Sequence, residues 1–304
     1  MRAFDLYVAK DSRDAVMLLA KHSATSKVKV IAGGTDLLAD LKFSAHSPNV
    51  VVDISRADEL KSITVTDGGL RIGALVTHSQ IMKSPVIQQM FPALVDAAHT
   101  IGAVQTRNLG TLGGNLVTAV PSMDSGPTLM ALEAIASIQG PGGRREVPLT
   151  DFFLGPRKTI LKADEILAEI IIPKQNLGKP THFLKFGLRK GQALALVNVG
   201  ASFWVDAKKN TFVAPRIGLG AVAPKVIHAP QAEAYLEGRE ITPEAMAEAG
   251  RIAATDAKPI SDFRHRPDTG KTWSRSSLNG HWKAHTLCRK PSDRVRALLG
   301  ARCK

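Results

Sequence analysis

Two glycine-rich stretches constrain this chain more than any other feature of its sequence. Residues 30–38 read Val-Ile-Ala-Gly-Gly-Thr-Asp-Leu-Leu, and residues 105–116 read Gln-Thr-Arg-Asn-Leu-Gly-Thr-Leu-Gly-Gly-Asn-Leu. Because glycine has no Cβ, a Gly-Gly turn can present consecutive backbone N–H groups to a ligand at close range. A row of N–H groups forms an anion-binding hollow. Two such hollows could hold one diphosphate from two sides, which points to a dinucleotide.

The common phosphate-binding motifs do not fit these stretches. The Rossmann fingerprint requires G-x-G-x-x-G between a strand and a helix, and neither stretch has glycines in that order. A P-loop is also absent, because no Gly-Lys-Ser/Thr follows either stretch. For a Gly-Gly pair taken alone, an ordinary tight turn is the alternative interpretation.

The composition is that of an ordinary globular protein, with 44% hydrophobic and 22% charged residues. A length of 304 residues suits two domains, or at most three. No apolar run approaches the roughly 18 residues of a membrane helix, and the first residues do not resemble a secretory signal. We therefore expect a cytoplasmic protein without a membrane span. Cys288 and Cys303 lie near the end of the chain, which excludes a disulfide framework from the rest of the protein.

A net charge of +13 raises the alternative of a basic nucleic-acid-binding protein. However, residues 264–304 carry 11 Lys and Arg against 2 Asp and Glu, so +9 of that charge lies in this segment. Aromatic residues, on which single-stranded nucleic acids stack, make up only 5% of the chain. We therefore expect no nucleic-acid partner.

Hydrophobic periodicity and turn signals predict a mixture of helices and strands, and so an α+β protein. In the first part we expect a helix capped by Asp11 or Ser12 and a helix beginning at Thr77, with more helix to about residue 101. Strands are expected at 27–31 and 50–54, and a hairpin at 63–72. The helix after the first glycine stretch is expected to be capped by Thr35 or Asp36 and to run to about residue 42. Residues 129–138 are expected to turn from helix to strand, with a returning strand at 145–149.

Beyond residue 173 we expect an antiparallel sheet with strands at 183–188, 197–205 and 212–221, and a helix that opens at Thr242.

In its motifs the chain resembles the FAD-binding subunits of molybdenum hydroxylases, a family that includes carbon monoxide dehydrogenase medium chains and the flavin domain of xanthine dehydrogenase. Both glycine stretches match the family patterns, A-G-G-T/H-D/S-L-L and Q-I-R-N-x-G-T-x-G-G-N, except that Thr106 stands where the family usually has Ile. The resemblance extends to about residue 264, with further motifs in the family's order at residues 74–78, 121–124, 151–155, 164–167, 171–173, 183–185 and 217–223.

The resemblance implies a two-part FAD-binding domain of the vanillyl-alcohol-oxidase/PCMH type over residues 1–175, with lobes at about 1–55 and 56–175. A smaller α+β domain with an antiparallel sheet should follow over residues 176–263. Residues 264–304 depart from the family pattern and form an atypical basic tail. We hypothesise a reading-frame shift near Arg264, and a genuine tail that binds a partner is the alternative. Resequencing the gene around codon 264 decides between them.

The resemblance also implies non-covalent FAD and assigns residues to it. Arg107 could clamp a phosphate or form a structural ion pair, and we assign no chemistry to His78. Asp124 should contact the adenosine end, although it could instead cap the helix that follows. Lys185 should lie near the flavin ring, where its charge would stabilise the anionic reduced flavin. The pyrophosphate should lie between Ile31, Ala32, Gly33, Gly34, Thr35, Asp36 and Leu37 on one side and Gly110, Thr111, Gly113, Gly114 and Asn115 on the other. Ile101, Ile166 and Leu167 should also lie near the flavin ring, although on apolarity alone they would be core residues.

No residue set for a molybdenum cofactor or a cysteine-ligated cluster is visible in residues 1–263. The resemblance places these groups in a large molybdopterin subunit and a small subunit with two [2Fe–2S] clusters, and we expect a dimer of heterotrimers. Electrons would pass from molybdenum through the clusters and FAD to an external acceptor, which the sequence does not identify. A free-standing FAD oxidase or dehydrogenase is the alternative, but no convincing substrate base or nucleophile lies near the glycine stretches.

Overall fold

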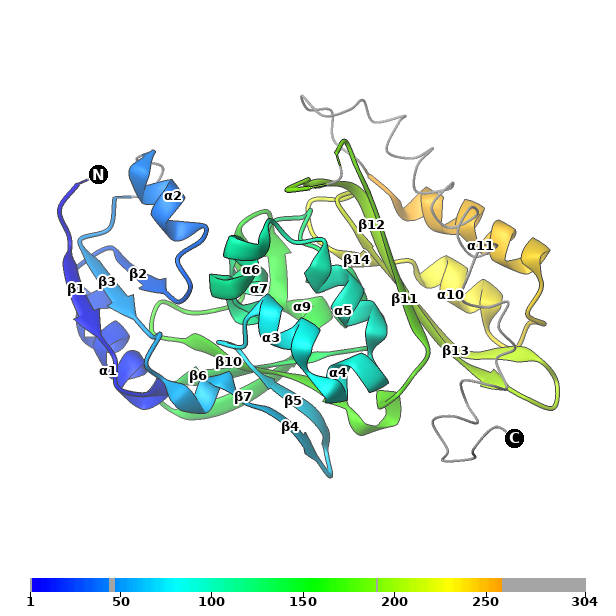
Figure 1. The fold of residues 1–304 in the computed structure, drawn as a ribbon, viewed down its shortest axis with the longest axis horizontal. Helices are drawn as coiled ribbons and strands as arrows, with labels where there is room; N and C mark the ends of the chain where they lie inside the picture. Colours follow the sequence, from blue (N-terminus) through cyan, green and yellow to red (C-terminus); the bar gives the residue numbers. More distant parts are fainter. Residues whose placement is uncertain (1, 44–46, 190, 259–304) are drawn as a thin grey trace. The chain divides into compact units, whose positions relative to one another are not determined.

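A computed structural model describes residues 2–43, 47–189 and 191–258 of the chain (Figure 1). The chain forms two compact units, each built from non-contiguous segments. Of the described residues, unit 1 comprises 2–43, 47–84, 101–120 and 133–177, and unit 2 comprises 85–100, 121–132, 178–189 and 191–258. Two segments from the first half of the chain therefore pack with the C-terminal sheet.

Unit 1 contains a small parallel sheet with the strand order β1 (Asp5–Val8), β3 (Val50–Asp53) and β2 (Val28–Ile31). Helix α1 (Ser12–Ser23) begins at the predicted cap, because the Asp11 side chain accepts a hydrogen bond from the Asp14 N–H at 2.8 Å. The buried α1 residues Ala15 and Leu19 pack into the same apolar cluster as Val50 and Val52. Strand β1 is an addition to the predicted elements. It has only four residues, too few for a periodic pattern to show.

The larger sheet of unit 1 has five strands in the order β4 (Ile63–Thr66), β5 (Gly69–Gly73), β10 (Ile166–Pro173), β6 (Ile135–Gly140) and β7 (Gly143–Pro148). The predicted hairpin is confirmed as β4 and β5. The central strand β10 is a second addition. Its apolar residues are buried almost throughout, and such a run has no period that separates a strand from a buried helix. Shorter elements of this unit are η1 (Asp58–Lys61), α9 (Leu149–Phe152), β8 (Phe153–Gly155), β9 (Lys158–Thr159) and η2 (Lys174–Asn176).

Four short helices of unit 1 carry or flank the glycine stretches: α2 (Leu37–Lys42), α3 (His78–Lys83), α6 (Val104–Leu109) and α7 (Leu112–Thr118). Helix α3 begins at Thr77 as predicted, in a capping box with Gln80. Asp36 occupies the cap position of α2, but its side chain makes no capping bond. Its carboxylate accepts instead from the Thr118 hydroxyl at 3.1 Å, which ties α2 to the end of α7.

The sheet of unit 2 confirms the predicted antiparallel strands, in the order β11 (Thr181–Gly187), β12 (Ala195–Asp206), β13 (Thr211–Gly220) and β14 (Ile227–His228). Alternate residues of β12 face opposite ways, as the period of two requires. Val197 and Val199 lie in the apolar core with α10 (Pro230–Leu236) and α11 (Pro243–Asp256), and the predicted Thr242 cap of α11 is formed.

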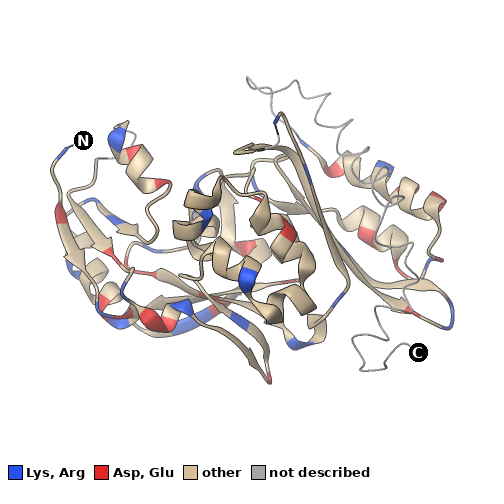
Figure 2. Ribbon diagram, viewed as in Figure 1, with Lys and Arg blue, Asp and Glu red and all other residues tan. Residues whose placement is uncertain are grey.

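The other face of β12 lies against α8 (Ser125–Ala131), and α4 (Pro85–Met90) and α5 (Pro92–His99) complete the unit. The Ser202 hydroxyl donates to the Ala131 carbonyl of α8 at 2.6 Å. A Cβ on Gly200 or Gly218 would lie 2.5 or 2.3 Å from the Pro127 carbonyl oxygen. Glycine is required at both positions because the helix backbone contacts the sheet directly. In Figure 2, acidic and basic residues are interspersed along the elements of both units, in agreement with the near balance of charge in residues 1–263.

Candidate functional site

The first glycine stretch forms the turn between β2 and α2 and leaves its backbone donors free. In the described part of the chain, none of the backbone N–H groups of residues 32–37 donates a hydrogen bond. Gly34 has φ +70°, in the left-handed region that glycine adopts without a steric penalty. The predicted row of available N–H groups is therefore present in this stretch.

The two glycine stretches lie against each other. A Cβ on Gly33 would lie 1.7 Å from the carbonyl oxygen of Leu109 and 2.5 Å from its carbonyl carbon. Real Cβ atoms essentially never approach another atom closer than 3.0 Å. Gly33 is thus the residue that lets the two backbones touch, and a ligand on one stretch lies beside the other.

The second glycine stretch is not an open turn, so that part of the prediction is wrong. Helix α6 ends at Leu109, and Gly113 and Gly114 lie in the first turn of helix α7. The Gly113 N–H donates to the Ala74 carbonyl at 2.9 Å, and the Gly114 N–H donates to the Thr111 hydroxyl at 3.0 Å. Both donors are therefore used within the fold.

Packing explains why this second pair is glycine. A Cβ on Gly113 would lie 2.6–2.9 Å from Ala74, and one on Gly114 would lie 2.9 Å from the Thr111 hydroxyl oxygen. The N–H groups of Gly110, Leu112 and Asn115 also donate to backbone carbonyls. Residues 110–115 all lie in the described part of the chain. Of their backbone N–H groups, only that of Thr111 donates no hydrogen bond.

The apolar residues predicted near the flavin ring also lie in unit 1. Ile101 is half-buried just before α6, and its carbonyl accepts a hydrogen bond from Arg107 Nη1 at 2.9 Å. Arg107 thus binds the loop before its own helix. Ile166 and Leu167 begin β10 and are each 3% exposed. Ile166 packs in the apolar core of the unit.

Lys185 and Asp124 form a buried charge pair in unit 2. Lys185 Nζ lies 2.5 Å from Asp124 Oδ2 and also donates to the Thr100 carbonyl at 3.1 Å. Asn198 Nδ2 donates to the second carboxylate oxygen of Asp124 at 2.9 Å. Burial raises the pKa of Asp124, and the Lys185 charge opposes that shift. Although Asp124 stands at the start of α8, its side chain does not cap the helix, so the capping alternative is wrong.

This direct contact bears on the roles expected for the two residues. Asp124 and Lys185 were expected at opposite ends of one cofactor, the adenosine end and the flavin ring. The structure instead joins the two residues in one ion pair. Asp124, at the start of α8, contributes the carboxylate, and Lys185 of β11 contributes the ammonium group. Any ligand that meets one of these groups lies close to the other.

His78 of α3 stands beside the glycine stretches and was assigned no chemistry from the sequence. Its backbone N–H donates to the Gly110 carbonyl at 3.1 Å, and its side chain is 2% exposed. Burial lowers the pKa of His78 to about 4, and the positive charge of Arg107 adds to the shift. The ring is therefore neutral at pH 7. The sequence signal that could have found it is the capping Thr77 immediately before it, which fixes where α3 begins.

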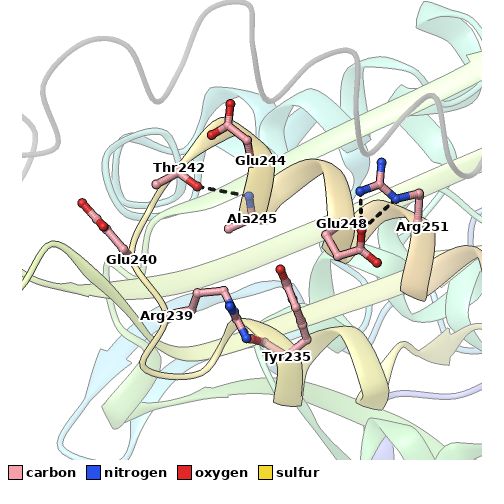
Figure 3. A pocket seen from close by; sticks show the side chains of 8 residues that line it. All are labelled: Tyr235, Arg239, Glu240, Thr242, Glu244, Ala245, Glu248 and Arg251. Carbon is pink, nitrogen blue, oxygen red and sulfur yellow. Dashed lines mark hydrogen bonds and ion pairs between the residues drawn. The ribbon is translucent and has the colours of Figure 1, made fainter.

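A separate hollow of about 410 Å³ lies on unit 2, beside α10 and α11 (Figure 3). Charged residues of both signs line it, and they are largely engaged with their neighbours. Arg239 lies over the Tyr235 ring at 4.0 Å, and Arg251 pairs with Glu248. None of the residues predicted to bind the cofactor lines this hollow.

The described residues lack two features. Among them, no helix combines the length and the apolar character needed to cross a bilayer. The same residues contain no group of three or more His, Cys, Asp or Glu side chains placed to hold a metal ion.

Comparison with known proteins gives two family matches that together span most of the chain. Residues 2–175 match the family described as the FAD binding domain in molybdopterin dehydrogenase. Residues 182–279 match the CO dehydrogenase flavoprotein C-terminal domain. The second match continues past residue 264, where the motif resemblance ends. The frame-shift hypothesis itself concerns residues outside the described part of the chain.

Individual relatives agree with these matches. The nicotinate dehydrogenase FAD-subunit of Eubacterium barkeri is 35% identical over 81% of this chain and 83% of its own length. The carbon monoxide dehydrogenase medium chain of Hydrogenophaga pseudoflava is 31% identical over 92% of this chain and 97% of its own length. A solved structure of carbon monoxide dehydrogenase from H. pseudoflava superposes with a TM-score of 0.86 at 31% identity, covering 91% of this chain and 95% of that one.

Proposed function

The chain belongs to the family of FAD-binding subunits of molybdenum hydroxylases, and from that premise we propose how its residues hold the cofactor and which step they serve. The subunit passes electrons from the [2Fe–2S] clusters of a partner chain through FAD to an external acceptor. When bound, FAD supplies the ability to take up electrons singly and release them as a pair. The protein supplies the binding groups and the electrostatic surroundings.

We assign the pyrophosphate of FAD to the junction of the two glycine stretches. The contact between Gly33 and Leu109 carries this proposal, because it brings distant parts of the chain to one place. The free N–H groups from Ala32 to Leu37, together with that of Thr111, are the donors an anion requires. The residues present therefore fit a diphosphate. Gly110, Gly113, Gly114 and Asn115 hold the second stretch in position.

The charge pair of Asp124 and Lys185 is our candidate for tuning the flavin. We keep Lys185 as the cation near the ring and treat Asp124 as the group that fixes its position. The adenosine contact expected for Asp124 also stays a proposal. It requires that Asp124 meet the adenosine while its carboxylate is paired with Lys185. Ile101, Ile166 and Leu167 stay proposed as apolar neighbours of the ring; of the three, Ile101 is half-buried, whereas Ile166 and Leu167 are buried in unit 1.

The relatives named as FAD-subunits and medium chains are parts of larger complexes. The large subunit of this family carries the molybdopterin and the small subunit carries the [2Fe–2S] clusters. For this chain we propose the corresponding heterotrimer, its pairing into a dimer of heterotrimers, and a cytoplasmic location. The domain boundaries at residues 175 and 263 belong to the same proposal.

Purification tests this function directly. We expect the full chain to show the visible bands of oxidised flavin and to release about one FAD per chain on denaturation, because the cofactor is not covalently held. Co-expression with genes for a large and a small subunit of this family should yield one complex that also contains molybdenum and iron. A colourless chain that gains no flavin on reconstitution would contradict the proposal.

A further inference from the structure

One row of residues crosses the sheet of unit 2 and faces the start of helix α8. In the strand register, Lys185 of β11 lies opposite Asn198 of β12, and Asn198 lies opposite Gly220 of β13. Directly opposed residues of an antiparallel pair lie on the same face of the sheet. Asp124, at the start of α8, binds both Lys185 and Asn198. Asn198 is thus an uncharged neighbour of both members of the charge pair.

The Asn198 amide is a double donor with a fixed orientation. Its Nδ2 donates to the Met123 carbonyl and to Asp124 Oδ1, each at 2.9 Å. Both partners are acceptors, so both N–H groups of the amide are used and its nitrogen must lie on this side. Asn198 Oδ1 is buried and has no hydrogen-bond partner among the described residues, and a Cβ on Gly220 would lie 2.1 Å from it. Because an unpaired buried oxygen costs free energy, stability alone does not explain the presence of this amide.

The amide acts on the charge state of Asp124. Burial raises the pKa of Asp124, whereas the Lys185 charge and the hydrogen bonds of Lys185, Asn198 and Thr100 lower it. Among these groups only Lys185 is charged. A hydrogen bond to the charged form of a carboxyl group favours that form. The Asn198 donor therefore helps to keep Asp124 ionised in a buried position.

The ammonium group of Lys185 is held at two points and keeps one donor. Lys185 Nζ lies 2.5 Å from Asp124 Oδ2 and donates to the Thr100 carbonyl at 3.1 Å. An ammonium group has three N–H donors, and no further partner of Lys185 is found in the described part of the chain. One N–H therefore remains for a ligand. While Asp124 is ionised, the pair has no net charge, so its field is weaker than that of a lone ammonium group.

We propose that Asn198 is a positioning residue for the flavin: its amide keeps the Asp124 carboxylate ionised and turned toward Lys185, so that Lys185 is fixed with one N–H left for the cofactor. This inference rests on the proposed function, because it takes Lys185 to be the cation near the flavin ring. Asn198 acts through Asp124 and does not itself touch the cofactor. Its removal should leave Lys185 as a cation that no ionised partner balances.

Asn198→Leu tests this role in the FAD-loaded full chain, because leucine has a similar size but no donor. Asp124 should then become protonated, and the unbalanced Lys185 charge should stabilise the anionic reduced flavin. We expect the midpoint potential of the bound flavin to become more positive, with reduced FAD gaining at least about tenfold in affinity relative to oxidised FAD. A dye-coupled reductive titration measures the potential.

Ser202→Ala is the matched control. Ser202 lies on the same strand, is 1% exposed and donates to the Ala131 carbonyl of the same helix at 2.6 Å. Its loss therefore removes another buried bond between β12 and α8 without touching Asp124. Both variants should lower the free energy of unfolding in urea, but Ser202→Ala should leave the flavin potential unchanged.

A double variant separates action through Asp124 from a general loosening of the site. Asp124→Asn also leaves the Lys185 charge unbalanced, so it should shift the potential in the same direction as Asn198→Leu. Addition of Asn198→Leu to Asp124→Asn should then cause no further shift. Additive shifts would show that Asn198 does not act through the carboxylate.

Carboxyl signals of the FAD-free chain provide a second readout that needs no cofactor. In the wild-type chain labelled with ¹³C-aspartate, the Asp124 signal, identified by its loss in Asp124→Asn, should be that of an ionised carboxylate at pH 7. In Asn198→Leu it should move to the position of a protonated carboxyl group. A protonated Asp124 in the wild-type chain would overturn the inference even if Asn198→Leu does not fold.

The outcomes separate this inference from the function on which it rests. If the wild-type chain binds FAD but Asn198→Leu leaves the flavin potential unchanged, the role of Asn198 is wrong and the function stands. If the wild-type chain binds no FAD, both are wrong.

Discussion

At the scale of single residues, the glycines of the two stretches serve different purposes that look alike in the sequence. Gly33 allows two backbones to touch, Gly34 adopts a left-handed conformation, and Gly113 packs against Ala74. The sequence pattern predicts that small residues are needed at these positions. It cannot tell a ligand-binding turn from a packed helix start, because the difference depends on Ala74, a residue from another part of unit 1.

Gly33→Ala should damage both the fold and the FAD site. The new Cβ would lie 1.7 Å from the Leu109 carbonyl oxygen, so one of the two backbones must move. We expect the free energy of unfolding to fall by about 1–3 kcal/mol, and FAD affinity to fall at least about tenfold. Gly142→Ala is the control, because nothing lies within 4 Å of the position of its Cβ. Urea unfolding and flavin fluorescence titration measure the two effects, and equal behaviour of the two variants would contradict the contact.

His78 should make the stability of the FAD-free chain depend on pH. Its pKa is about 4 in the folded chain, compared with 6.5 for an unperturbed histidine. Between these values the unfolded chain binds the proton and the folded chain does not, so stability falls as pH decreases from 6.5 to 4. The loss should be roughly 3 kcal/mol.

The His78→Gln variant isolates this effect from the other groups that titrate. The difference in unfolding free energy between wild type and variant should change across this pH window and stay constant above it. Urea denaturation at several pH values measures the difference. A constant difference from pH 7 to pH 4 would show that the ring is not held neutral by burial.

At the scale of elements, α8 is fixed to its sheet by a few polar contacts and by close backbone approach. Asp124 binds both Lys185 of β11 and Asn198 of β12. Ser202 bonds the last turn of the helix, and Gly200 lets Pro127 approach the sheet. These contacts explain why a segment from the middle of the sequence belongs to unit 2.

Removal of one member of the charge pair should cost more than removal of both. Lys185→Met leaves the Asp124 carboxylate buried and unpaired, so we expect a loss of about 3 kcal/mol in the free energy of unfolding. The double variant Lys185→Met with Asp124→Leu should recover much of that loss, because no unpaired charge remains. Arg251→Met is the control, since its pair with Glu248 is exposed and should contribute about 1 kcal/mol or less. Additive losses in the double variant would contradict a direct interaction.

The elements that could be predicted from the sequence are those with local signals. The caps at Asp11, Thr77 and Thr242 act within three residues of themselves, and the hairpin signal lies within its own turn. Strand β10 lacks such a signal, and the local cap of helix α7 at Thr111 does not reveal how its two glycines pack. Their environment is set by β5, β6 and Ala74, which lie far away in the chain. The pairing of Asp124 with Lys185 could not be predicted for the same reason, because the two residues lie 61 positions apart in the sequence.

At the scale of the whole molecule, the chain is one subunit whose chemistry depends on a bound cofactor and on partner chains. The glycine stretches meet within unit 1, and the Asp124–Lys185 pair lies within unit 2. The contact between the glycine stretches and the Asp124–Lys185 pair can therefore be tested separately with the variants described above. The family membership supplies the direction of electron flow, and the geometry of each unit supplies the residues.

A crystal structure of the full chain grown with FAD tests the central claim most directly. We predict that the phosphate oxygens lie within hydrogen-bonding distance of the N–H groups between Ala32 and Leu37 and of the Thr111 N–H. A diphosphate bound elsewhere, with these N–H groups facing only solvent, would contradict the account.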